Sequence, residues 1–150
     1  MLLTDLIATL QLSIGPVILI SGVGLIILSL TNRLGRTVDR TRQLSVEYRS
    51  ASGSDLVRIL SELKILTKRA KVLRSSNFFA VFSVLLVSLL IISLFGSVLY
   101  DFNMSYILIS LFILSIISLV VSLAFFIYDI ELSLIALWIE LPPAITQAGK

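Results

Sequence analysis

Long uncharged apolar stretches alternate along this chain with segments rich in charge. Three stretches contain no charged residue, at 6–30, 78–100 and 106–128, and they are 25, 23 and 23 residues long. A helix rises about 1.5 Å per residue, so the shorter stretches extend over roughly 34 Å and can cross a hydrocarbon core about 30 Å thick. They lack the polar–apolar alternation that is typical of transmembrane strands. The pattern therefore predicts three transmembrane helices.

The segment between the first two stretches, 31–77, predicts a helical hairpin. It contains no proline, and a cluster of small and polar residues at 50–54 divides it into two halves. In the second half apolar residues recur at helical spacing. An apolar stripe of this kind has to be buried, so we expect Leu60, Leu63 and Leu66 to lie between two antiparallel helices.

Beyond the third stretch, residues 129–141 form either a continuation of the third helix or a separate short C-terminal helix. The two prolines at 142–143 end any helix at this point. The predicted fold class is an all-α integral membrane protein. A single membrane domain, 1–150, carries three transmembrane helices and an antiparallel helical hairpin between the first and the second.

The composition agrees with a membrane protein and excludes several other classes. Hydrophobic residues make up 57% of the chain and charged residues 14%, and the mean hydropathy is +1.07. Soluble domains are near 45–50% apolar and 25% charged, and disordered chains are poor in large aliphatic residues. The chain has no cysteine and no histidine, which excludes disulfides, thiol nucleophiles, imidazole acid–base chemistry and the usual zinc ligands.

The distribution of charge predicts the orientation in the membrane. The segment 31–77 holds eleven basic and four acidic residues, a net charge of +7, and only one further basic residue occurs in the chain. Because cytoplasmic loops carry an excess of lysine and arginine, this hairpin is expected to be cytoplasmic. The N-terminus then lies outside and the C-terminus in the cytoplasm of a multi-pass protein.

Four arginines directly after the first apolar stretch, Arg33, Arg36, Arg40 and Arg42, are candidate contact residues. The simpler interpretation is a membrane anchor whose long side chains reach lipid phosphates. The functional interpretation is specific recognition of anionic phospholipid head groups or of a partner protein. Nucleic-acid binding is not expected, because the hairpin holds a single aromatic residue and no recognised nucleic-acid-binding motif.

The first apolar stretch carries a seam of small residues, Ala8, Gly15, Gly22 and Ser29, spaced seven apart. Small residues allow helices to approach closely in lipid, so the seam packs either against another helix of the same protomer or against a second copy in a homo-oligomer. Gln11, on the adjoining seam, is the most polar side chain within any span and a possible pore residue. Serines in the other two stretches fit either close helix packing or a hydroxyl-lined lumen.

Two segments, Ile14–Leu25 and Thr31–Arg42, resemble a known family, the small bacterial three-helix membrane proteins of the domain of unknown function 2721. The resembling sequences read IGPVILISGVGL and TNRLGRTVDRTR. The resemblance implies a bacterial inner (plasma) membrane protein and supplies no catalytic residue.

Nothing in the sequence indicates an enzyme. The carboxylates are scattered, the glycines of the charged segments are isolated, and no metal-ligand cluster or nucleophile motif occurs. We therefore predict no catalytic, cofactor-binding or metal-binding residues. The expected function is that of a non-enzymatic, self-associating membrane protein whose basic hairpin contacts anionic lipid or a partner. The alternative is a homo-oligomeric channel lined by the first transmembrane helix.

Overall fold

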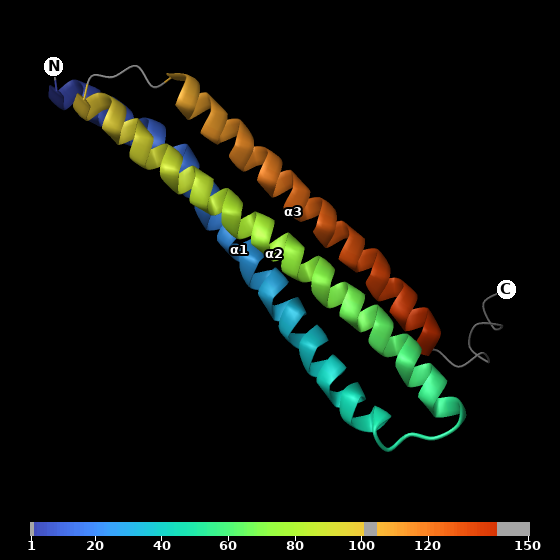
Figure 1. Ribbon diagram of the computed structural model, residues 1–150. Coiled ribbons are helices and arrows are strands. Elements are labelled where there is room, and N and C mark those ends of the chain that lie inside the picture. Colours follow the sequence, from blue (N-terminus) through green and yellow to red (C-terminus); the bar gives the residue numbers. More distant parts are fainter. Residues whose placement is uncertain (1, 101–104, 141–150) are drawn as a thin grey trace. The chain divides into compact units, whose positions relative to one another are not determined.

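The computed structural model describes residues 2–100 and 105–140, and these residues form three long helices and no strand (Figure 1). The helices are α1 (Leu2–Tyr48), α2 (Ser54–Tyr100) and α3 (Ser105–Glu140). Each contains a region long and apolar enough to cross a membrane. The prediction of an all-helical chain with three such helices is confirmed.

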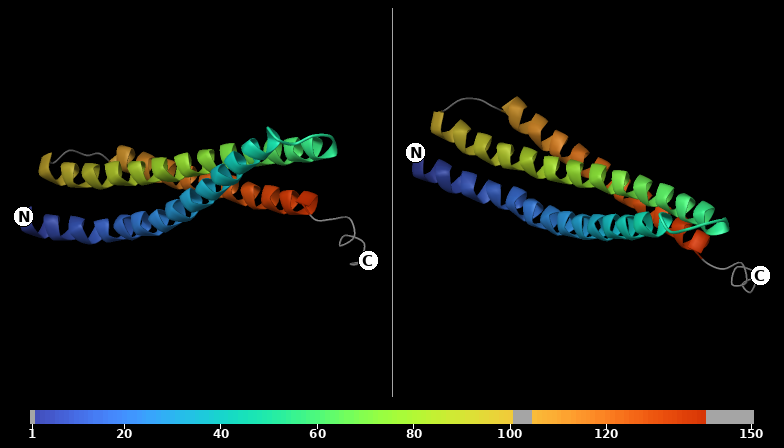
Figure 2. Two further views of the ribbon diagram at one scale, coloured as in Figure 1. Left: turned by 90° about the horizontal axis from the view of Figure 1, so that it is seen from below. Right: turned by 60° about the horizontal axis from the view of Figure 1, so that its bottom comes forward.

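Each helix continues without interruption beyond its uncharged stretch, as the additional views show (Figure 2). Of the two alternatives for the segment after the third stretch, the structure has the continuation: α3 runs to Glu140, and no separate short helix begins at residue 129. Leu141, the last residue of the predicted segment, lies outside the described residues. The absence of proline and glycine between 105 and 140 explains this continuity.

The chain divides into two compact units. Unit 1 comprises residues 1–29 and 77–123, and unit 2 comprises residues 30–76 and 124–150. Unit 1 therefore holds most of the three apolar stretches, and unit 2 holds most of the charged residues.

Burial in unit 1 follows a seven-residue repeat in α2 and α3. The buried positions alternate in steps of three and four, which is the spacing that faces a neighbouring helix in a coiled coil. Ala80, Ser83, Val87 and Leu90 in α2 have this spacing, as do Ser115, Ser118 and Ser122 in α3, and Leu86, next to Val87, is buried as well. Small residues at these positions let the backbones of α2 and α3 come close together.

Two of these serines make hydrogen bonds between the helices. The Ser83 hydroxyl donates to the carbonyl oxygen of Ser115 at 2.9 Å, and the Ser118 hydroxyl donates to the carbonyl oxygen of Phe79 at 2.8 Å. In lipid a hydroxyl without a partner is costly, so such bonds help to fix the register of two helices. Both serines thus serve the packing of α2 on α3, which is one of the two roles that the sequence left open.

Unit 2 has a small apolar core between the end of α1 and the start of α2. Leu44, Ile59 and Leu66 are buried together, and Ala51 and Leu63 pack against them partly buried. The connection between the helices spans residues 49–53 and contains Gly53 at φ +69°. Glycine adopts this left-handed conformation without the steric cost of a side chain.

The burial prediction for the leucines of this segment is right for Leu66, right in part for Leu63, which is partly buried, and wrong for Leu60. Leu66 is buried, whereas 46% of Leu60 is exposed. The buried positions of α2 in unit 2 include Ile59, Leu66 and Leu73, each seven residues apart. Leu60 lies one position beyond this repeat, about 100° around the helix, and therefore turns away from α1.

Candidate functional site

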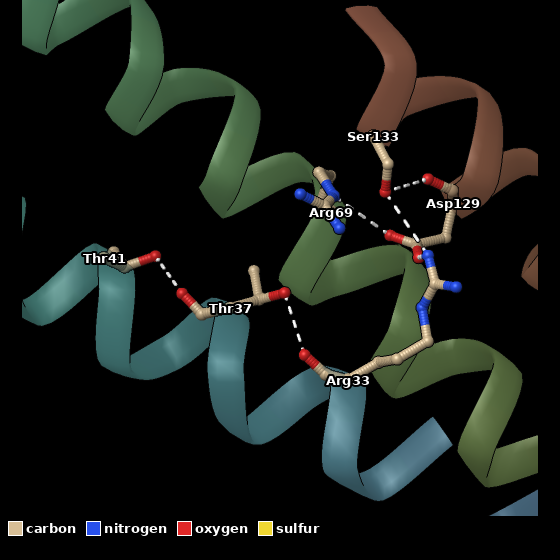
Figure 3. A network of polar contacts seen from close by, with 6 residues as sticks. All are labelled: Arg33, Thr37, Thr41, Arg69, Asp129 and Ser133. Atoms are coloured by element: carbon tan, nitrogen blue, oxygen red, sulfur yellow. Dashed lines mark hydrogen bonds and ion pairs between the residues drawn. The ribbon is translucent and has the colours of Figure 1, made fainter. Parts of the chain in front are cut away.

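The carboxylate of Asp129 in α3 binds two arginines from the other two helices, all within unit 2 (Figure 3). One Nη of Arg33, in α1, lies 2.7 Å from Oδ2 of Asp129, and Nε of Arg69, in α2, lies 3.2 Å from Oδ1. The Asp129 side chain is completely buried, while 25% of the Arg33 side chain and 17% of the Arg69 side chain are exposed. We call Arg33, Arg69 and Asp129 the charge cluster.

The position of Asp129 follows from the repeat that buries α3. Ser115 and Ser122 are buried, and Asp129 is the next residue at the same spacing of seven. Arg69 holds the corresponding place in α2, seven residues before the buried Ser76 and fourteen before Ser83. Charged side chains thus occupy core positions of two helices, where each needs an opposite charge to offset the loss of hydration.

Neighbouring side chains hold the charge cluster in place. The hydroxyl of Ser133 donates to the Asp129 carbonyl oxygen at 3.0 Å and accepts a hydrogen bond from Arg33 at 3.3 Å. The guanidinium of Arg33 also lies 5.1 Å from the ring centre of Phe126, a cation–π contact. The arginine is therefore oriented by a carboxylate, a hydroxyl and an aromatic ring, all from α3.

On the side of α1, two threonines continue the polar chain. The hydroxyl of Thr37 donates to the carbonyl oxygen of Arg33 at 3.0 Å, and that of Thr41 donates to the carbonyl oxygen of Thr37 at 2.8 Å (Figure 3). These bonds stay within one helix and satisfy the hydroxyls locally. Neither bond involves the guanidinium group of Arg33 or of Arg69.

A second ion pair, between Arg40 in α1 and Glu62 in α2, is more open to solvent. Nη and Nε of Arg40 donate to Oε1 of Glu62 at 3.0 and 3.2 Å. The Arg40 side chain is 47% exposed and that of Glu62 is 13% exposed. This pair joins α1 directly to α2, whereas the Arg33 and Arg69 contacts join each of these helices to Asp129 in α3.

The four arginines predicted as contact residues thus have different environments. Arg33 and Arg40 form the ion pairs just described, whereas Arg36 and Arg42 are exposed and form no salt bridge with any described residue. Of the four, Arg36 and Arg42 are therefore the exposed arginines without an ion-pair partner among the described residues.

Lysines extend the basic surface along α2. An open groove of about 500 Å³ in unit 2 is lined by Lys64, Lys68 and Lys71 together with Leu60, Leu63 and Thr67. The ammonium group of Lys68 also lies 5.4 Å from the ring centre of Tyr128 in α3. The groove combines an apolar floor with positive charge, which favours amphipathic anionic ligands.

The small-residue seam of α1 does not pack on another helix of unit 1. Ala8, Gly15, Gly22 and Ser29 are all exposed. A side chain added at Gly15 or Gly22 would meet no described atom within 4 Å. Gln11 is exposed as well. The seam is thus exposed in its own protomer, and contact with a second copy stays a prediction.

The buried positions of α1 in unit 1 lie on another face of the helix. Thr9, Ser13 and Val23 are buried, and the sequence analysis makes no prediction for them. Ala8 and Gly22 lie about 100° around the helix from Thr9 and Val23, and Gln11 lies further from that buried face. We use the name outer stripe for Ala8, Gln11, Gly15, Ile18, Gly22, Leu25 and Ser29, which are all exposed and recur in steps of three and four.

Among the residues described, no group of three or more histidine, cysteine, aspartate or glutamate side chains could hold a metal ion. The charge cluster contains a single carboxylate between two guanidinium groups. This arrangement offers hydrogen-bond donors and positive charge, and it therefore suits an anion.

The fold and the charge cluster define a class: an all-helical protein of the multi-pass membrane type, with a buried carboxylate that joins α1, α2 and α3 in unit 2. Residues 13–139 match the family model described as "Protein of unknown function (DUF2721)". The chain belongs to this family, as its resemblance in the two segments implied. No curated protein and no solved structure matches the chain significantly.

Proposed function

We propose that the protein is a non-enzymatic, multi-pass protein of the bacterial inner membrane that self-associates through the outer stripe of α1. Its basic hairpin, 31–77, lies in the cytoplasm and contacts anionic phospholipid head groups. The N-terminus lies outside and the C-terminus in the cytoplasm. The observation that carries the proposal is the outer stripe, which is exposed over its whole length although it has the spacing of a helix–helix contact.

Gln11 supports self-association because its amide is exposed within an otherwise apolar segment. An amide in the hydrocarbon region needs hydrogen-bond partners, and lipid tails provide none. The same amide from a second copy can both donate and accept, so two stripes are complementary to each other at this position. Gly15 and Gly22, one and three turns further along, allow the two backbones to approach closely.

Further along α1, the same spacing reaches Arg36 and Asp39, which are exposed and form no ion pair with the described residues. In a parallel assembly of two stripes, Arg36 of one copy comes near Asp39 of the next. Charged pairs beside an apolar seam set the register and the orientation of coiled coils. These two residues therefore favour a parallel arrangement of copies, as a common orientation in the membrane requires.

The exposed basic residues support the contact with lipid. Arg36, Arg42, Lys64 and Lys71 are exposed and form no salt bridge with the described residues. Each basic residue near an anionic leaflet contributes about 1 kcal/mol of attraction. The net charge of +7 in segment 31–77 is therefore large enough to hold the hairpin against the head groups.

The experiment that tests self-association substitutes Gly22→Leu, with Gly24→Leu as the matched control. Both glycines are exposed, and neither has a described atom within 4 Å of an added Cβ. Gly24 lies off the outer stripe, so its leucine faces lipid. In mild detergent Gly22→Leu is expected to yield folded monomers, while the wild type and Gly24→Leu keep the same oligomeric mass. An oligomer that survives in Gly22→Leu contradicts the proposed contact.

A channel lined by α1 is the second candidate, and the exposure of Gln11 is the observation that favours it. In a ring of copies the outer stripe faces either a neighbouring α1 or a central lumen. Ion flux into liposomes distinguishes the two: a channel conducts and loses conductance when Gln11→Leu removes its polar group. A sealed assembly gives no flux in either protein.

A further inference from the structure

The charge cluster has one more positive than negative charge. Arg33 and Arg69 each carry a permanent positive charge, and Asp129 is the one acidic residue among those described that lies within salt-bridge distance of either. Glu131, the nearest acidic residue along α3, is exposed and forms no salt bridge with the described residues. A partly buried charge without a counter-ion is unfavourable, so the cluster favours the approach of an anion.

Both guanidinium groups also have N–H groups that form no hydrogen bond with the described residues. Arg33 donates to Asp129 and Ser133 through the same Nη, and Arg69 donates to Asp129 through Nε alone. A guanidinium has five N–H groups in a planar fork. Nη1 and Nη2 of Arg69 therefore form no hydrogen bond with the described residues. A fraction of both side chains is exposed, 25% for Arg33 and 17% for Arg69, which gives a ligand access to them.

The sequence places two members of this cluster at the end of apolar stretches, and Arg69, nine residues before the stretch 78–100, contacts one of them. Asp129 directly follows the uncharged stretch 106–128, and Arg33 follows 6–30 by three residues. Phe126 contacts Arg33, and Tyr128 contacts Lys68. Aromatic and basic side chains gather in this way at the level of lipid head groups. The anions present in quantity at that level are lipid phosphates.

We infer that Arg33 and Arg69 form a specific binding site for the phosphodiester group of an anionic phospholipid, beside the carboxylate of Asp129. The planar forks match two phosphate oxygens each, and an arginine–phosphate pair is among the strongest charge-assisted contacts. The inference rests on the proposed function for the orientation of the hairpin toward the inner leaflet. It goes beyond that proposal because it assigns one bound lipid to two partly buried residues rather than to a diffuse basic surface.

The test counts phospholipids that remain bound to the full-length protein in native mass spectrometry. The protein is purified in maltoside detergent and mixed with equal amounts of phosphatidylglycerol and phosphatidylcholine. The wild type is expected to retain one phosphatidylglycerol preferentially, and Arg69→Gln is expected to lower its occupancy about fivefold or more, the effect of one unit charge at a membrane surface. Arg58→Gln is the matched control: it removes the same charge from the same helix.

Arg58 suits this purpose because it is exposed, forms no salt bridge with the described residues and lies eleven residues from Arg69. This separation is about 16 Å along α2, beyond the distance over which an exposed charge acts at physiological salt. A diffuse basic surface predicts equal losses for Arg58→Gln and Arg69→Gln. Equal losses, or no loss in Arg69→Gln, overturn the specific site and leave the general contact with lipid intact.

Asp129→Asn is expected to change lipid binding in the opposite direction from Arg69→Gln. It therefore tests the lipid site even if Arg69→Gln does not fold. Asparagine keeps the size of the side chain but removes the negative charge that competes with phosphate for the guanidinium groups. The lipid site predicts that phosphatidylglycerol binds about fivefold more tightly to Asp129→Asn, whereas a purely structural cluster predicts unchanged or weaker binding. Unchanged or weaker binding overturns the inference.

Two further outcomes separate the lipid site from its alternatives. If inorganic phosphate at equal concentration displaces the bound phosphatidylglycerol, the site belongs to a free anion, and the assignment to lipid is wrong. If the wild type shows no preference for phosphatidylglycerol over phosphatidylcholine, both the site and the lipid contact of the proposed function fail. The oligomeric mass measured in the same spectra tests self-association independently.

Discussion

Replacing Asp129 with alanine tests how much the charge cluster contributes to the stability of unit 2. The substitution removes the carboxylate that both Arg33 and Arg69 contact, at 2.7 and 3.2 Å. It leaves two guanidinium groups facing each other without a counter-ion. The resulting loss of stability has two sources: the lost charge-assisted hydrogen bonds and the repulsion between the arginines.

The magnitude follows from the burial of the three side chains. Removing one partner from a fully buried ion pair costs about 3–5 kcal/mol. Asp129 is fully buried, but Arg33 and Arg69 keep 25% and 17% of their side-chain surface exposed. Because both arginines can turn partly toward water, we expect a smaller loss, about 2–3 kcal/mol in the free energy of unfolding, near the value of hydrogen bonds to charged groups.

The matched control is Glu62→Ala, which breaks the ion pair with Arg40. Arg40 is 47% exposed, and exposed ion pairs contribute about 0.2–1 kcal/mol. Both variants are unfolded by heating in maltoside micelles that contain no anionic lipid, and the loss of helix is followed by circular dichroism. If Asp129→Ala destabilises the protein no more than Glu62→Ala, the buried cluster does not stabilise unit 2 in the way its geometry indicates.

Two further predictions concern packing and topology. Leu66→Ala is expected to lower the free energy of unfolding by about 2–5 kcal/mol because it opens a cavity in the core of unit 2. Leu60→Ala is expected to cost less than about 1 kcal/mol, because Leu60 is 46% exposed. Equal losses in chemical unfolding contradict the burial pattern. With single cysteines introduced in cells, Ser105→Cys is expected to react with a membrane-impermeant maleimide added outside and Ser52→Cys to be protected, because the net charge of +7 predicts a cytoplasmic hairpin. The reverse pattern contradicts the orientation.

The sequence was sufficient for the helices because their signals are local. An uncharged stretch of 23 residues is long enough to predict a helix without knowledge of its neighbours. The break at 49–53 likewise follows from the small and polar residues around Gly53, which has the left-handed conformation that glycine favours. The sequence leaves the continuation of α3 past Tyr128 open, because Asp129 and Glu131 are equally typical of the end of a span.

The charge cluster was missed because its residues are far apart in sequence and each has an ordinary local explanation. Arg33 fits a membrane anchor, Arg69 fits an exposed basic helix face, and Asp129 fits a helix end. The signal that was present is the spacing of Asp129 from Ser115 and Ser122, since these positions share one face of α3 and are all buried. A charged residue on a repeat of buried small residues predicts an interhelical ion pair, although the repeat alone does not identify which of eleven basic residues in segment 31–77 is the partner.

The inward face of α1 is the harder case, because two faces of this helix carry the spacing of a helix–helix contact. One contains Ala8, Gly15 and Gly22, and the other contains Thr9 and Val23, one residue further along. In a soluble protein the exposed face of a helix is recognised by its polar residues. In a membrane an apolar face can be exposed to lipid, so hydrophobicity does not show which of the two faces is buried. In the structure Thr9 and Val23 are buried while the glycines are exposed. The face with Thr9 and Val23 thus packs within the protomer, and the face with the glycines and Gln11 is left exposed. We expect this pattern if the exposed face contacts another copy. The comparison of Gly22→Leu with Gly24→Leu is therefore the most direct test of whether this protein acts as an assembly.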